Sequence, residues 1–364
     1  MWNWRKIRCV FFLSALVLYG CSNHVDKPYS PGSWALTGFV KADSVNPVLQ
    51  PSADSKFFCP VSKKEVRWEE RNVFNPAAVV RDGKVYLLYR AQDNEMTSRI
   101  GMAVSSDGLH FTREPEPVFF PDADSMNIYE WKGGVEDPRI VMSPDGTYIM
   151  TYTSYDGETA RLCLATSPDL MKWQKHGPVL GDDKYKDTWS KSGAIVTRLN
   201  GNNFVAAKVE GKYWMYFGDT DLFIAYSEDL LHWNVAENEE SGKMIAVMNP
   251  RAGYFDSRLV EPGPFAMLAD SGILLLYNGS NASSFNDSSL PKFTYSAGQA
   301  LFNREKPYRL VDRLKENFLQ PDKPYEKTGE VNEVCFIEGL VFFNDRWFLY
   351  YGTADSKIAV AVKQ

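Results

Sequence analysis

Three segments of the sequence place a polar residue before a proline and an apolar run after it. The polar residues are Asn75, Asp137 and Glu261. Proline is tolerated at the first position of a β-strand, so each polar residue is expected where a strand begins. Two carboxylates that face each other across one pocket are the minimum requirement for cleaving a glycosidic bond. The alternative is that each polar residue only caps its strand.

Further charged side chains follow at the ends of predicted strands. Arg90 and Asp93 end one such run. A protein binds a sugar through many hydrogen bonds and through aromatic faces. The charged residues can form the hydrogen bonds, and an aromatic content of 14% supplies the faces. For any one of these residues, the alternative is a solvated charge on a rim. Comparable positions are occupied by Lys208, Asp219, Asp221, Arg258 and Asp355, and Glu136 and Arg139 lie beside Asp137.

A repeat predicts how these residues come together. Turn residues at positions 83, 146, 211, 272 and 345 are separated by 63, 65, 61 and 73 residues. Each unit has a turn, an aromatic-rich strand, a second turn and a strand of small residues, which is typical of antiparallel sheets. Five units of four strands predict an all-β, five-bladed β-propeller in one domain, whereas a linear β-solenoid would have shorter units. Because equivalent positions of a radial array converge, Asn75, Asp137 and Glu261 should face one cavity.

The composition excludes several classes of protein. The 364 residues include 40 Lys and Arg, 46 Asp and Glu and 44% apolar residues, which indicates a globular chain. The net charge of −6 disfavours binding to nucleic acid. The histidines form no pair with metal-ligand spacing, which disfavours a catalytic zinc site. The sequence implies neither a metal nor an organic cofactor. Cys59, Cys163 and Cys335 are odd in number, which disfavours a disulfide framework, and the last two lie in apolar runs typical of a core.

The N-terminus has the layout of an export signal. Basic residues precede the apolar run Cys9–Tyr19, which is too short to span a bilayer. The sequence Leu18-Tyr19-Gly20-Cys21 resembles the bacterial lipoprotein processing box, with lipidation at Cys21. The alternative is an ordinary signal peptide with an incidental cysteine. We therefore expect a signal peptide over residues 1–20, a lipidated tether over 21–40 and a catalytic propeller over 41–364, anchored in the bacterial cell envelope.

Five blocks of sequence occur in order along the chain: Phe74-Asn75-Pro76-Ala77-Ala78, Tyr89-Arg90-Ala91, Gly134-Val135-Glu136-Asp137-Pro138-Arg139, Ser227-Glu228-Asp229-Leu230-Leu231-His232-Trp233 and Tyr350-Tyr351-Gly352-Thr353-Ala354-Asp355. Together they resemble glycoside hydrolase family 130. The resemblance implies a five-bladed propeller that acts on β-mannosides, either as an inverting phosphorylase or as a hydrolase. It aligns Asp137 with the family's proton donor, which in the phosphorylases acts through a sugar hydroxyl. It also places Asn75, Arg90, Asp93 and Asp355 at positions that line the site.

Two departures from the phosphorylases of this family favour hydrolysis. Those enzymes typically carry an Arg after the third aromatic strand and Tyr-His-Gly in the fourth unit. This chain has Tyr216-Phe217-Gly218-Asp219 and Tyr277-Asn278-Gly279 instead. Phosphate is a dianion that needs cationic donors, so these losses disfavour phosphorolysis. A carboxylate can instead activate water, and Glu261, then Asp219, are the candidate bases. The acid, Asp137, is expected to have a raised pKa.

The position of Glu261 resembles that of a glutamate in the lipoprotein hydrolases of this family, which attack β-1,2-linked mannosides. The resemblance therefore implies a lipid-anchored, inverting, exo-acting β-mannosidase for β-1,2-linked, or β-1,4-linked, manno-oligosaccharides. The polar loop at residues 281–291 would close the pocket to long polymers. One alternative is a phosphorylase that releases mannose 1-phosphate, with Lys191, Lys208 and Arg258 as anion holders. Others are a non-catalytic glycan-binding lipoprotein and, less supported, an arabinan- or fructan-cleaving propeller. The expected site comprises catalytic Asp137, Glu261 and Asp219, and substrate-binding Asn75, Arg90, Asp93, Glu136, Arg139, Lys208, Arg258, Asn278 and Asp355.

Overall fold

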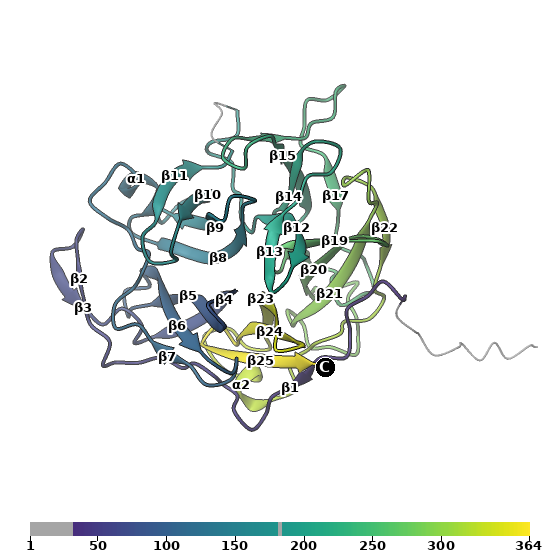
Figure 1. Ribbon diagram of the computed structural model, residues 1–364. Helices are drawn as coiled ribbons and strands as arrows, with labels where there is room; N and C mark the ends of the chain where they lie inside the picture. Colours follow the sequence, from purple (N-terminus) through teal and green to yellow (C-terminus); the bar gives the residue numbers. More distant parts are fainter. Residues whose placement is uncertain (1–31, 181–183) are drawn as a thin grey trace, which may run out of the picture. The chain divides into compact units, whose positions relative to one another are not determined.

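The structure is a computed structural model that describes residues 32–180 and 184–364 (Figure 1). Strands form nearly all of its regular structure, as the sequence predicted. The helices among the described residues, α1 (Asn127–Glu130) and α2 (Pro324–Lys327), have four residues each. The segment Pro31–Gln364 forms one unit. The predicted signal peptide and Cys21 lie outside the described residues.

Consecutive strands pair in antiparallel groups, and each predicted repeat unit corresponds to one group. The first two groups are β4 (Asn72–Arg81), β5 (Lys84–Gln92), β6 (Ser98–Ser105) and β7 (Thr112–Arg113), then β8 (Gly134–Met142), β9 (Tyr148–Tyr155), β10 (Ala160–Ser167) and β11 (Gln174–Pro178). The next contains β12 (Ala194–Asn200), β13 (Asn203–Ala206), β14 (Tyr213–Phe217), β15 (Leu222–Ser227), β16 (Trp233–Val235) and β17 (Ala246–Met248). It is followed by β18 (Leu259–Pro262), β19 (Ala266–Ala269), β20 (Gly272–Ser280), β21 (Tyr295–Phe302) and β22 (Leu310–Arg313). The last contains β23 (Cys335–Phe343), β24 (Arg346–Thr353), β25 (Lys357–Lys363) and β1 (Val40–Lys41), while β2 (Phe57–Cys59) and β3 (Lys64–Val66) form a separate pair.

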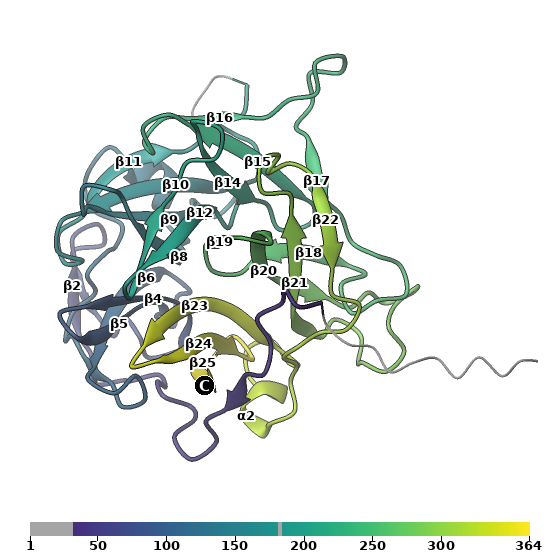
Figure 2. The same ribbon diagram turned by 45° about the vertical axis from the view of Figure 1, so that its right-hand side comes forward.

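The groups follow one another around a centre, and β1 joins the last group. Figures 1 and 2 show β4, β8 and β23 near this centre and β1 beside β25. In that pair, Val40 lies opposite Val362. The described part of the predicted tether also packs on this domain, because Trp34 Nε1 donates to Asp312 at 2.9 Å and the backbone N–H of Leu36 donates to Gln299 at 2.8 Å.

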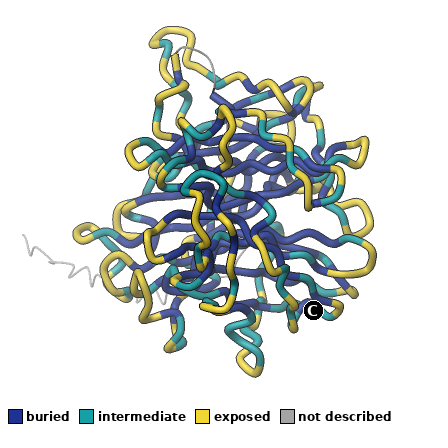
Figure 3. Tube along the Cα trace, turned by 90° about the vertical axis from the view of Figure 1, so that its left-hand side faces the viewer, coloured by how far each residue is buried: buried dark blue, intermediate teal, exposed yellow. Residues whose placement is uncertain are grey.

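The strands nearest the centre are buried along almost their whole length. Every residue of β4 up to Val80, and of β8 up to Val141, is buried. Figure 3 shows buried strands inside and exposed residues concentrated in the connecting loops. Cys163 and Cys335 are buried and free, as the apolar runs predicted. A polar side chain on β4, β8 or β23 therefore lies in the interior and needs a partner or a function.

A buried tyrosine on β5, β9, β20 or β24 recurs as an anchor in most groups. Its hydroxyl donates to a buried carboxylate, which also forms an ion pair with a cation from elsewhere in the chain. In the group of β12–β17, the equivalent Tyr216 instead donates to the carbonyl of Pro307 at 2.8 Å. The tyrosine–carboxylate pairs are Tyr89–Glu69 at 2.8 Å, Tyr152–Glu130 at 2.9 Å, Tyr277–Asp256 at 2.7 Å and Tyr351–Glu326 at 2.8 Å. The cations are Arg113, Lys175, Arg251 with Arg313, and Lys41, respectively.

Candidate active site

Asn75 and Asp137 lie at irregular points of β4 and β8. Their φ angles are 46° and 47°, in the left-handed region, and the pairing with the next strand shifts register at both points. A β-bulge releases a residue from the ladder and redirects its side chain. Glu261, by contrast, pairs regularly with Asn278 one residue before the end of β18. The repeated polar-proline motif therefore gives two bulges and one ordinary strand position.

The three residues nevertheless line one cavity, as the repeat predicted. Its volume is about 300 Å³, at the lower end of the range for small-molecule sites. Charged groups and apolar or aromatic walls surround the same space, which suits the hydroxyls and C–H faces of a sugar. The remaining lining residues are Phe74, Arg90, Lys191, Arg258, Tyr295, Val331, Val334, Phe336 and Asp355.

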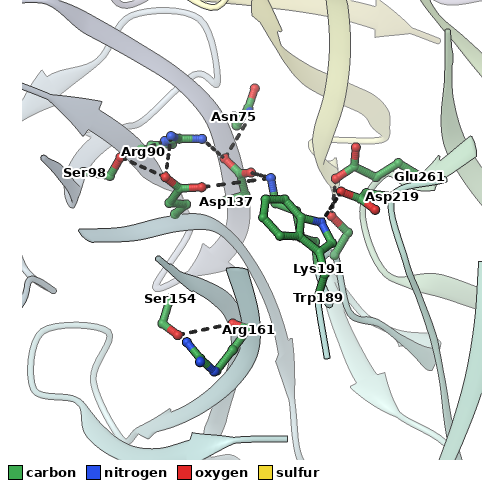
Figure 4. A network of polar contacts seen from close by, with 12 residues as sticks. Asn75, Arg90, Ser98, Asp137, Ser154, Arg161, Trp189, Lys191, Asp219 and Glu261 are labelled. Carbon is green, nitrogen blue, oxygen red and sulfur yellow. Dashed lines mark hydrogen bonds and ion pairs between the residues drawn. The ribbon is translucent and has the colours of Figure 1, made fainter. Parts of the chain in front are cut away.

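Cations surround the carboxylate of Asp137 (Figure 4). Asn75 Nδ2 donates to Asp137 Oδ1 at 3.0 Å, and Arg90 Nη1 donates to the same oxygen at 3.2 Å. Lys191 Nζ lies 3.8 Å from Asp137 Oδ2. Burial alone would raise the pKa of this carboxyl, but the charges of Arg90, Lys191 and Arg139 outweigh burial and lower it to about 2. The expectation of a raised pKa for Asp137 is therefore wrong.

Glu136 lies beside Asp137 and shares its cations. Arg90 Nη2 donates to Glu136 Oε1 at 2.6 Å, and Lys191 Nζ lies 4.0 Å from Oε2. Burial raises the pKa of Glu136 despite these charges. Glu136 is not among the residues that line the cavity. Its contact with Arg90 instead fixes the guanidinium that faces Asp137.

Glu261 faces the cavity from β18. Its side chain accepts a hydrogen bond from the Ser192 hydroxyl, and the residue is 6% exposed. Burial raises its pKa to about 7; the nearby charge of Lys191 lowers this pKa and that of Asp219 raises it. A pair of carboxyls whose pKa values are pushed apart is the arrangement that acid–base catalysis uses. Asp137 and Glu261 form such a pair.

Two other acids lie near this pair. Burial raises the pKa of Asp355, which lines the cavity, to about 6. Asp219 is not among the lining residues, and its Oδ2 accepts a hydrogen bond from Trp189 Nε1 at 2.7 Å. Asp219 therefore lies near Glu261 but outside the cavity wall.

Three residues that the sequence predicted to bind substrate lie elsewhere. Asp93 is buried in an ion pair with Arg99 at 2.8 Å, so its charge is already used within the fold. Asn278 is fully buried, and its side-chain amide forms hydrogen bonds with the backbone of β23 at 3.0 and 2.8 Å. The ammonium of Lys208 lies 4.9 Å from the centre of the Tyr213 ring. The strand-end pattern therefore identified polar residues without showing which of them face the cavity.

Arg139, also predicted to bind substrate, is buried and connects two strands. Its Nη1 donates to the carbonyl of Asp137 at 3.1 Å. Nε and Nη2 donate to the carbonyls of Gly263 and Pro262 at 2.6 and 2.7 Å. Because Pro262 follows Glu261, one guanidinium links the backbone at both carboxyls of the pair. Arg139 therefore supports the site from within the core.

Glu338 completes this buried cluster and was missed by the sequence analysis. Its Oε2 lies 3.5 Å from Arg139 Nη2, and neither carboxyl oxygen has a hydrogen-bond partner within the described part of the chain. Burial raises its pKa well above the usual range. Glu338 lies at a register shift of β23, as Asn75 and Asp137 do on their strands. The motif search missed it because Gly339, not proline, follows; its position in the repeat was the available signal.

The all-β domain and its cavity, with paired carboxylates and aromatic walls, define a class of glycoside-active enzymes. A family model described as beta-1,4-mannooligosaccharide phosphorylase matches residues 41–364, and the chain belongs to glycoside hydrolase family 130. The relative "1,2-beta-oligomannan phosphorylase" from Thermoanaerobacter sp. (strain X514) is 31% identical over an alignment of 334 residues, and the match covers 89% of this chain and 96% of the relative. This family includes both phosphorylases and hydrolases.

Solved structures show the same fold at higher identity. A glycosyl hydrolase from Bacteroides ovatus is 45% identical with a TM-score of 0.90, over 92% of this chain and 96% of the other. A structure from work on family 130 hydrolases that target β-1,2-mannosidic linkages in Candida mannan is 44% identical, also with a TM-score of 0.90. That match covers 93% of this chain and 97% of the other.

Replacing Arg139 by lysine should destabilise the domain. Lysine lacks the planar fork that serves several carbonyls, so at least one buried acceptor would lose its partner. We expect Arg139→Lys to lower the free energy of unfolding by about 2–3 kcal/mol, measured by urea denaturation. The control is Arg304→Lys, at an exposed arginine that lies 3.8 Å from Asp270. This substitution should change the free energy of unfolding by less than about 1 kcal/mol. Equal effects of the two substitutions would contradict this role of Arg139.

Proposed function

We propose that this protein is an inverting, exo-acting β-mannosidase that hydrolyses β-1,2-linked manno-oligosaccharides. The observation that carries the proposal is the charge balance of the cavity. Arg90 and Lys191 are already paired with Glu136 and Asp137, so little positive charge remains to offset the desolvation of a phosphate dianion. The charged lining residues among those described are the cations Arg90, Lys191 and Arg258 and the acids Asp137, Glu261 and Asp355.

Asp137 and Glu261 are the proposed acid–base pair. The resemblance in the Glu136–Arg139 block assigns proton donation to Asp137, and Glu261 then activates water. An inverting enzyme holds such carboxyls about 6.5–9.5 Å apart so that a water molecule fits between them. Since cations lower the pKa of Asp137 to about 2, this assignment requires the bound substrate to weaken its contact with Arg90 or Lys191.

Two relatives support the substrate class. The name of one relative states action on 1,2-beta-oligomannan, and the 44% identical structure comes from work on hydrolases of β-1,2-mannosidic linkages. The loop at residues 281–291 supports exo action. Asn281 Nδ2 holds this loop by donating to the carbonyls of Asp287, Leu290 and Pro291, at 2.9, 3.1 and 3.1 Å. Phe293 follows this loop, and its ring centre lies 5.2 Å from the guanidinium carbon of the lining residue Arg258.

The proposal extends to the blade count and to the location of the enzyme. The antiparallel groups are proposed to be the five blades of a β-propeller. Residues 1–20 would be removed as a signal peptide, and Cys21 would carry the lipid at the start of a tether. Among the described residues, no helix is long and apolar enough to cross a membrane. The enzyme would then act at the bacterial cell envelope.

The products formed from β-1,2-mannobiose test the reaction. Hydrolysis predicts mannose with or without phosphate in the buffer, detected by chromatography of the products. Asp137→Asn and Glu261→Gln should each lower kcat by about 10²–10⁴-fold, because each removes a proton-transfer group. The control is Glu240→Gln at an exposed position, which should retain activity. Mannose 1-phosphate formed only with phosphate would instead establish phosphorolysis, and no turnover would favour a glycan-binding protein.

The pH dependence of kcat/KM tests whether the pair works with one shared proton. With a pKa of about 2 at Asp137 and about 7 at Glu261, the singly protonated pair is lost when Glu261 ionises, so kcat/KM should fall as pH rises through about 7. Lys191 favours the ionised carboxylate, so Lys191→Met should raise the pKa of Glu261 and move this fall to higher pH. A rise of kcat/KM through the same pH range would mean that the active pair carries no proton and would contradict acid–base catalysis by Asp137 and Glu261.

Cell fractionation tests the anchor. Full-length protein expressed in a bacterium should sediment with membranes and incorporate labelled palmitate. Cys21→Ser should abolish the label and release the protein from membranes, because it removes the acceptor of the lipid. Labelling of the Cys21→Ser variant at the level of the parent would refute lipidation at this residue.

A further inference from the structure

We propose that Trp189 is a stacking platform for the second pyranose ring of the substrate, next to the ring enclosed by the cavity. This inference rests on the proposed function and deepens it. Trp189 is 50% exposed, although a tryptophan side chain is normally highly buried. The C–H face of a pyranose can cover an exposed aromatic face while its hydroxyls bind nearby polar groups.

The chain around Trp189 places the indole beside the catalytic pair. Two residues later, Lys191 Nζ lies 3.8 Å from Asp137 Oδ2. The next residue, Ser192, donates its hydroxyl to Glu261. Figure 4 shows the indole between the Asp137 side and the Glu261 side of the site in this view. The segment from 189 to 192 therefore contacts both acids and presents the exposed ring next to them.

The indole is held in one orientation before substrate arrives. Its Nε1 donates to Asp219 Oδ2 at 2.7 Å, and the ring of Tyr155 packs against it with centroids 6.4 Å apart and planes at 69°. The neighbouring Ser190 is 4% exposed, and its hydroxyl accepts a hydrogen bond from the Leu162 backbone N–H at 3.0 Å. A preorganised aromatic surface binds a ring with little loss of conformational entropy.

The position of Trp189 indicates which sugar it contacts. It is not among the residues that line the 300 Å³ cavity around Asp137 and Glu261, where the reacting mannose binds. A ring attached to that mannose must leave the cavity, and Trp189 lies beside the two acids with half of its surface exposed. The ligand is therefore a pyranose unit on the leaving-group side, and a methyl group there would be too small to use the platform.

Steady-state kinetics on two substrates test the platform. Trp189→Ala should raise KM for β-1,2-mannobiose by up to about tenfold, which corresponds to aromatic stacking energies. The kcat/KM for methyl β-mannoside should stay within about twofold of the parent. Trp189→Phe should restore most of the affinity for mannobiose, because it retains an aromatic face. Equal losses on both substrates, or no loss on either, would overturn the proposal.

The control substitution is Trp214→Ala. Trp214 also donates its indole N–H, to the Val209 carbonyl at 3.0 Å, and packs against Tyr226, but, unlike Trp189, it has no cavity-lining residue within two positions along the chain. It should leave KM for mannobiose unchanged, and thermal unfolding of each variant confirms that it is folded.

Binding measured without turnover separates this inference from the proposed function. In an Asp137→Asn background, calorimetry should show that Trp189→Ala weakens binding of mannobiose but not of mannose. If the parent protein turns over no β-mannoside but Trp189→Ala still weakens only mannobiose binding, the mannosidase is refuted and the platform is supported. Unchanged mannobiose affinity would refute the platform, whatever the reaction proves to be.

Discussion

The buried guanidinium of Arg139 is the interaction on which the site depends. Strand groups arranged around a centre hydrogen bond mainly within themselves, so a contact across the centre is needed to fix residues of different groups. Arg139 donates to the carbonyl of Asp137 and to that of Pro262, the neighbour of Glu261. Burial raises the pKa of Glu261, and the charge of Arg139 opposes this rise; at Asp137 it adds to the larger effects of Arg90 and Lys191 that lower the pKa. The same side chain therefore fixes the position of the proposed catalytic pair and contributes to its electrostatics.

The electrostatics of the cavity connect this scaffold to the choice of reaction. Arg90 forms ion pairs with Glu136 and Asp137, and Lys191 lies within 4.0 Å of the same two carboxylates. Because these cations are already paired with carboxylates, they can offset little of the negative charge of a bound phosphate. By the resemblance, phosphorylases of this family carry an Arg and a His near the positions of Asp219 and Asn278, where this chain has no cation. Under the proposed function, water is therefore the acceptor that fits this charge balance.

The sequence predicted the all-β repeat and brought Asn75, Asp137 and Glu261 to one cavity, because periodic spacing survives folding. It did not separate cavity residues from buried ones. Asp93 and Asn278 lie at strand ends like Arg90, yet their partners, Arg99 and the backbone of β23, come from contacts that a linear motif does not contain. The predicted pKa of Asp137 was wrong for the same reason, because that pKa depends on burial and on charges that come from separate segments of the chain. Glu338 was missed because its bulge lacks the proline that marked the others.

The segment from Trp189 to Ser192 shows how binding can influence chemistry in such a scaffold. Its backbone is held at Lys191, whose carbonyl accepts the Gly218 N–H at 2.9 Å, and its side chains reach an acceptor on each side of the cavity. Lys191 lowers the pKa of Asp137 together with Arg90, whose effect is larger, and Ser192 donates a hydrogen bond to Glu261. A sugar ring that settles on Trp189 therefore contacts the segment that controls both acids. In this proposal, the four residues from Trp189 to Ser192 connect binding of the leaving-group sugar to the protonation of Asp137 and Glu261.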